Sequence, residues 1–110
     1  MTLGELVSQI DAFNRAWKVA LSRHGSGSSI SMALRDRKTD LQLQLLADFP
    51  KESSLHLDSA DFDEPQYSIR LKPAAELPNG SKRMDANHIP VRVIQRFESD
   101  NTIENKTRNS

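Results

Sequence analysis

The hydrophobic residues at the start of the chain follow the repeat of an amphipathic helix. Between Thr2 and His24 they recur three or four residues apart, which places them on one helix face. Thr2 and Glu5 form a capping-box pattern, and Gly25 supplies a left-handed stop after the last turn. The pattern predicts one long helix with a single buried face, on which Trp17 is the central core residue. Its apolar positions are Leu3, Leu6, Val7, Ile10, Phe13, Trp17, Ala20 and Leu21.

After the Gly-Ser connection at 25–29, the hydrophobic repeat changes to every second residue. That repeat is typical of a half-buried β-strand. Ile30, Met32 and Leu34 alternate with small or polar residues and predict a first strand. The charged residues at 35–38 then predict a turn.

The segment 41–49 has two interpretations. Alternation of leucine with glutamine favours a second strand that pairs with the first as a hairpin. A short helix also fits, because Leu41 and Leu45 are four residues apart, no residue is β-branched, and Thr39 or Asp40 can cap it. We favour the strand and keep the helix as the alternative.

Later in the chain, three further strands are expected. Leu55 and Leu57 predict a short strand, and the alternation at 67–71 predicts a longer one with a basic outer face. Pro73 and Pro78 bracket a segment that we expect outside the sheet. Asn79-Gly80 predicts a turn, and alternation over 89–97 predicts the last strand, with Pro90 at its start indicating an edge position.

The predicted architecture is therefore α+β. One N-terminal amphipathic helix packs on a mainly antiparallel sheet of four or five strands, which together form a single domain over 1–97. Residues 98–110 contain only Ile103 as a strongly apolar residue, so we expect a flexible, disordered polar tail there. The order of capped helix, Gly-Ser connection, Leu-Gln strand and 67–73 strand is similar in layout to small helix-plus-sheet modules that accompany effectors in bacterial conflict systems.

Composition narrows the classes of function. The chain has 110 residues, fifteen basic and fifteen acidic side chains, and no cysteine, which excludes disulfide scaffolds, thiolate metal sites and cysteine nucleophiles. The first residues lack a basic region followed by an apolar run, and no apolar segment approaches the roughly 20 residues of a membrane-spanning helix. We therefore expect a soluble, cytoplasmic protein without a membrane partner.

The sequence contains no strong motif for phosphate binding, metal binding or catalysis. The 25–29 segment closes a helix instead of opening one, which is the wrong context for a phosphate-binding loop. The acidic stretch at 58–64 does not have the spacing of a calcium-binding loop, and His24, His56 and His88 lack a metal-ligand spacing. We expect no catalytic, metal-binding or cofactor-binding residues, and hence no enzyme.

Basic residues are the remaining functional signal. They support a small non-enzymatic interaction or accessory protein that holds a protein partner, or a second copy of itself as a homodimer, through an exposed sheet edge or a basic sheet face. The alternative is a nucleic-acid-associated protein that uses the same residues as a local basic patch. The candidate partner-binding residues are Arg35, Arg37, Arg70, Lys72, Arg92 and Arg96.

Overall fold

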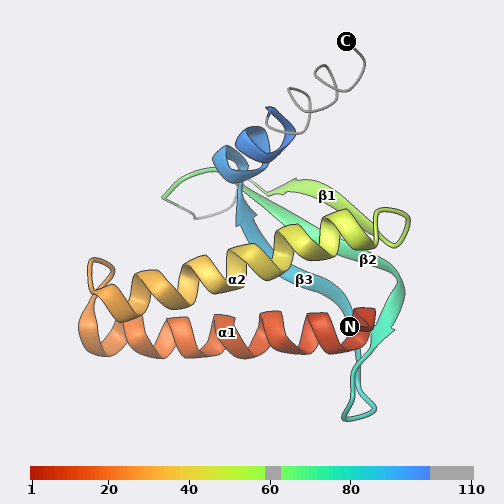
Figure 1. The fold of residues 1–110 in the computed structure, drawn as a ribbon, viewed down its shortest axis with the longest axis horizontal. Coiled ribbons are helices and arrows are strands. Elements are labelled where there is room, and N and C mark those ends of the chain that lie inside the picture. The colour runs from red at the N-terminus through yellow and green to blue at the C-terminus, as the bar shows by residue number, and fades with distance from the viewer. Residues whose placement is uncertain (59–62, 100–110) are drawn as a thin grey trace.

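The computed structural model describes residues 1–58 and 63–99. These residues form an α+β fold of three helices and a three-stranded antiparallel sheet (Figure 1). The predicted class is confirmed, but the predicted layout of one helix on a four- or five-stranded sheet is wrong. The elements are α1 (Leu3–His24), α2 (Ser29–Asp48), β1 (Ser53–Asp58), β2 (Gln66–Glu76), β3 (Lys82–Pro90) and a C-terminal helix at 91–99.

The helix α1 begins and ends where the sequence predicts. The Thr2 side chain accepts a hydrogen bond from the Glu5 amide, and the Glu5 carboxylate accepts one from the Thr2 amide, which completes the capping box. Gly25 follows the last turn with a φ of 80°, and its amide donates to the Leu21 carbonyl. Local capping and a single apolar stripe therefore suffice to define this helix.

The helix α2 replaces both predicted strands at 30–34 and 41–49 and the turn between them. Ser28 caps it, since its hydroxyl accepts a hydrogen bond from the Ser31 amide. Leu41 and Leu45 are fully buried one turn apart, as the helical alternative for 41–49 requires. The likeness to helix-plus-sheet modules depended on a Leu-Gln strand here, and the helix removes it.

The sheet is a meander in the order β1-β2-β3. The predicted strands at 55–57 and 67–71 are confirmed within β1 and β2, and the Asn79-Gly80 turn joins β2 to β3 with Gly80 at a φ of 86°. The expectation that Pro73 ends the sheet is wrong, because β2 continues to Glu76. The register between β2 and β3 shifts around that proline, which accommodates its missing amide proton.

The predicted strand over 89–97 is also wrong. β3 occupies a polar segment that the alternation did not indicate, and it ends at Pro90. Residues 91–99 are helical, and Ile94 is buried in the core. Of the predicted tail, 98–99 belong to this helix, and 100–110 lie outside the described residues.

The core lies between the helical hairpin of α1 and α2 and one face of the sheet. Leu6, Ile10 and Leu41 from the hairpin pack with Ile69 and Ile89 from the strands. Figure 1 shows the two helices side by side, with their connecting loop extending beyond the strands. Among the described residues, no helix is both long and apolar enough to cross a membrane.

Trp17 is not the core anchor that the sequence predicts. It is half-buried and lies outside the core cluster, on the part of α1 that extends past the sheet. The same turn of α1 contributes the buried Asn14. The apolar stripe of α1 therefore changes neighbours along its length, from a core shared with α2 and the sheet in its first half to a cavity near Asn14 and Trp17.

Candidate binding cavity

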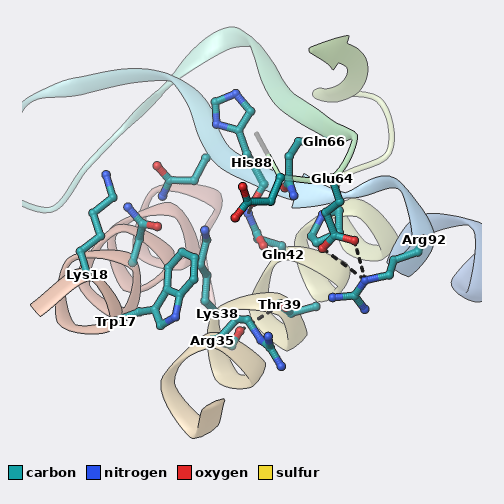
Figure 2. A pocket seen from close by; sticks show the side chains of 14 residues that line it. Trp17, Lys18, Arg35, Lys38, Thr39, Gln42, Glu64, Gln66, His88 and Arg92 are labelled. Atoms are coloured by element: carbon teal, nitrogen blue, oxygen red, sulfur yellow. Dashed lines mark hydrogen bonds and ion pairs between the residues drawn. The ribbon is translucent and has the colours of Figure 1, made fainter. Parts of the chain in front are cut away.

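A cavity of about 410 Å³ opens between the hairpin, the segment before β2 and the end of β3. We call it the hairpin cavity. Trp17 and Lys18 line it from α1, Lys38 and Gln42 line it from α2, and His88 lines it from β3 (Figure 2). Its volume lies within the range of about 300–1,000 Å³ that is usual for ligand sites.

Lys38 is the most unusual side chain of the hairpin cavity. Only 7% of it is exposed, and its ammonium lies 4.9 Å from the centroid of the Trp17 ring. Within the described part of the chain, it forms no ion pair with a carboxylate. Burial, together with the nearby positive charge of Lys18, lowers the pKa of Lys38 to about 8. The protein thus holds a desolvated cation whose only described partner is an aromatic face.

Gln42 lies one helical turn after Lys38 and is fully buried. Its Nε2 donates hydrogen bonds to the carbonyl oxygens of Ala86 at 2.9 Å and His88 at 3.0 Å, which ties α2 to β3. Its Oε1 is buried without a hydrogen-bond partner in residues 1–58 and 63–99. Buried acceptors are nearly always satisfied, so an unpartnered Oε1 at this position is unusual.

Among the described residues, the charge around the hairpin cavity is mainly positive. In that part of the chain, four lysine or arginine side chains line it against two carboxylates. Arg92 is already engaged, since its Nε lies 2.9 Å from the Glu64 carboxylate. In Figure 2, the Lys38 side chain rises past the Trp17 ring toward the middle of the cavity, where no dashed line reaches it. The basic residues are Lys18, Arg35, Lys38 and Arg92, and the acidic ones are Asp63 and Glu64.

The structure brings together only two of the six predicted partner-binding residues. Arg35 and Arg92 both line the hairpin cavity, although they are far apart in sequence. Arg37 is exposed and lies two residues beyond Arg35, and therefore on another side of α2. The other three residues are exposed on two elements, Arg70 and Lys72 on β2 and Arg96 on the C-terminal helix.

Arg70 and Lys72 face away from the helices. They alternate along β2 with the buried Ile69 and Leu71, so they belong to the opposite face of the sheet. Arg70 donates a hydrogen bond from its Nε to the Ser68 hydroxyl at 3.1 Å. The predicted basic sheet face therefore exists locally on β2 but is separate from the hairpin cavity.

Two of the three histidines, His56 and His88, have polar partners within the sheet. His88 Nε2 lies 3.0 Å from the Asp58 carboxylate, and His56 Nε2 lies 3.0 Å from the Ser54 hydroxyl. In the described ranges, no three His, Asp or Glu side chains gather as a metal site. The structure describes the acidic stretch 58–64 only in part, because 59–62 lie outside the described residues.

Comparison with known proteins gives no match. Neither protein-family models nor curated proteins nor solved structures match the chain. The function must therefore be argued from the residues of the hairpin cavity.

Sequence reasoning missed the residues that define this cavity. The sequence pattern predicts a turn at Lys38 and the polar face of a strand at Gln42, and neither prediction indicates burial. The available signal was the spacing of Arg35, Lys38, Thr39 and Gln42, which share one face of a helix but not of a strand. Recognising that spacing requires the helical interpretation of the whole segment from 29 to 48.

Proposed function

We propose that the protein is a non-enzymatic binding module that receives an acidic side chain of a protein partner in the hairpin cavity. The observation that carries this proposal is the largely buried side chain of Lys38, whose ammonium has no carboxylate partner in the part of the chain that the structure describes. A desolvated charge is costly unless an opposite charge compensates it. A partner carboxylate next to Lys38 supplies that compensation.

The free Oε1 of Gln42 points to a peptide as the ligand. Gln42 lies one turn after Lys38 and lines the same cavity, so a ligand that presents a carboxylate together with a hydrogen-bond donor matches both residues. An aspartate or glutamate in a peptide has both groups, since its backbone amide is a donor close to the side-chain carboxylate. The two unsatisfied groups of α2 are thus complementary to one acidic residue.

Apolar surface beside the cavity supports a protein partner. Leu21 lies one turn after Trp17 and Lys18, and Met32 lies one turn before Arg35, so both extend the lined faces of the hairpin. Met32 is 43% exposed. Apolar residues around a desolvated polar centre are typical of protein interfaces.

Nucleic acid remains the alternative partner, with less support. A phosphate backbone needs several cations along one continuous surface. Arg35 and Arg92 lie at the cavity, whereas Arg70 lies on the sheet face turned away from the helices. The arrangement of these residues favours a single acidic side chain over an extended polyanion.

A selection from random peptides tests the proposal without knowledge of the natural partner. Peptides displayed on phage are selected on the full-length protein, on Lys38→Met and on Lys51→Met, an exposed lysine away from the cavity. We expect the wild-type protein and Lys51→Met to enrich one aspartate or glutamate flanked by apolar residues. Lys38→Met should lose that preference and bind the selected peptides at least tenfold more weakly, as loss of a buried charge pair predicts.

The pKa of Lys38 provides an independent readout. Binding of a selected acidic peptide should raise the pKa of Lys38 above about 8, because a carboxylate favours the charged ammonium. Amine-detected NMR titration of the free and bound protein measures this change. Three results would each contradict the proposal: selected peptides without an acidic position, equal binding of the peptides by Lys38→Met, or an unchanged pKa of Lys38 on binding. If the protein instead binds oligonucleotides with an affinity that falls as the salt concentration rises, the nucleic-acid alternative is favoured.

A further inference from the structure

The two outer strands of the sheet are protected to different degrees. β3 carries charged residues, its register with β2 is shifted twice, and Asn87 has a φ of 64°. An ion pair of 3.0 Å between Arg83 and Asp11 also fastens β3 to α1. Such features hinder the addition of another strand. β1 has fewer of them: Ser53–Asp58 contains no lysine, arginine or proline, and it pairs with β2 through six consecutive residues without a shift. Its one acidic residue, Asp58, lies at its end and is paired with His88 of β3.

The register identifies the free backbone groups of β1. The Lys72 amide donates to the Glu52 carbonyl at 2.9 Å, which makes these two residues a hydrogen-bonded pair of the antiparallel ladder. Because such pairs alternate, Ser54, His56 and Asp58 bond to β2. The amides and carbonyls of Leu55 and Leu57 therefore point away from the sheet.

The side chains along this edge are apolar on the helix-facing side. Leu55 is paired with the buried Ile69, and Leu57 with Tyr67, so both leucines lie on the face that the helices cover. Leu55 packs against the core, whereas Leu57 is 66% exposed. Within residues 1–58 and 63–99, the edge thus combines backbone groups that have no hydrogen-bond partner with an exposed leucine at position 57.

The sequence Leu55-His56-Leu57 reads the same in both directions, which makes the edge complementary to itself. In an antiparallel pair of identical strands related by a twofold axis at His56, Leu55 stands opposite Leu57 of the second copy. This register joins the outward amides and carbonyls of both leucines and places leucine against leucine on the helix-facing side. It also sets Ser54, a hydroxyl donor, opposite the carboxylate of Asp58 in the second copy.

We propose that β1 is a homodimerisation edge, at which two copies of the chain pair antiparallel about His56 and form one six-stranded sheet. The contact uses one short strand from each copy, which makes it smaller than a standard stable interface of about 1,600 Å². We therefore expect a reversible dimer with a dissociation constant in the micromolar range. This edge is separate from the hairpin cavity, and the dimer does not depend on the proposed partner.

Sedimentation equilibrium from about 10 μM to 1 mM tests the dimer, with Leu57→Lys and Leu57→Pro as disrupting variants. Position 57 suits both changes, because its side chain is exposed and its amide points outward, so neither change removes a core contact or a ladder hydrogen bond. Met84→Lys is the matched control, since Met84 is 70% exposed on β3. We expect the wild-type protein and Met84→Lys to dimerise alike, and both Leu57 variants to weaken the dimer at least tenfold.

Amide hydrogen exchange identifies the contact independently. The amides of Leu55 and Leu57 should exchange more slowly as the protein concentration rises, while the amide of His56, already bonded to β2, should not change. Far-ultraviolet circular dichroism checks that the Leu57 variants remain folded. A protein that stays monomeric up to 1 mM overturns the proposal, as does a dimer that survives both Leu57 variants or is lost equally in Met84→Lys.

Discussion

The ammonium of Lys38 lies 4.9 Å from the centroid of the Trp17 ring, so a charge on α2 faces the indole of α1. Attraction between a cation and an aromatic face contributes about 0.5–2 kcal/mol, whereas removing an ammonium from water costs several kcal/mol. The lowered pKa of Lys38, about 8, reflects this imbalance. The hairpin therefore retains an energetic cost that a bound anion would relieve, which is the basis of the proposed binding function.

Replacement of Lys38 by methionine should stabilise the free protein at pH 7. Folding lowers the pKa of Lys38 from 10.5 to about 8. Each pKa unit corresponds to about 1.4 kcal/mol, so keeping Lys38 charged in the folded protein costs at most on the order of 3 kcal/mol of stability. Between about pH 8 and 10.5, the unfolded chain still binds the proton that the native state has released. The free energy of unfolding of the wild-type protein should therefore rise with pH across this window relative to Lys38→Met.

Urea titrations of both proteins at pH 7, 8, 9 and 10 measure this difference. The advantage of Lys38→Met should be largest at pH 7 and shrink toward pH 10. A constant difference across the series would show that packing, and not the charge of Lys38, sets the effect.

Gln42→Leu should destabilise the protein by about 1–3 kcal/mol. The substitution leaves the carbonyls of Ala86 and His88 without their donor, and a lost buried hydrogen bond costs about this much. Gln44→Leu is the matched control, because Gln44 is exposed on the same helix and should change stability by less than about 0.5 kcal/mol. Chemical denaturation of the two variants measures both values, and equal effects would contradict the role assigned to Gln42.

Gly4→Ala should destabilise the protein, although alanine favours helix formation over glycine by about 1 kcal/mol. A Cβ atom at this position of α1 would overlap the backbone carbonyl oxygen of Glu76, and a backbone atom at the end of β2 cannot rotate away. We expect a net loss of about 1–3 kcal/mol, as for other overpacked sites. Gly27→Ala, with open space around the added atom, should leave the melting temperature unchanged or slightly raised. A stable Gly4→Ala variant would place α1 farther from β2.

Ser28→Ala should shorten or weaken the start of α2. The Ser28 hydroxyl accepts from the Ser31 amide at 3.2 Å and donates to the Ser31 hydroxyl at 2.8 Å. Loss of an N-cap of this kind costs about 1 kcal/mol. Ser26→Ala removes a hydroxyl from the exposed part of the same loop and serves as the control in thermal unfolding. If Ser26→Ala has the larger effect, the helix does not begin at residue 29.

The elements that the sequence predicted correctly are those with local signals. α1 has a capping box, a left-handed glycine and one apolar stripe, all of which act within a few residues. The Asn79-Gly80 turn and the alternation at 67–71 are equally local. The strand β3 carries little such signal, because its buried residues are only Ala86 and Ile89 among polar neighbours.

The helix α2 was missed because its neighbours differ along its length. Leu41 and Leu45 pack in the core with residues of the sheet, whereas the face with Lys38 and Gln42 lines the hairpin cavity. Apolar residues are consequently distributed around the helix, and the leucine-glutamine alternation resembles a strand. Helix-favouring residue types and the capping by Ser28 outweigh that pattern.

The amino-acid pattern alone is enough to predict the α+β class, the capped first helix, the absence of cysteine chemistry and the presence of basic residues without a catalytic motif. Which polar groups lose water depends on how the elements pack in three dimensions. Lys38 and Gln42 resemble their exposed neighbours in sequence, but packing of α2 between α1 and β3 buries them. Their burial depends on residues brought together from three separate elements, and the physical chemistry of a buried charge then defines the candidate site.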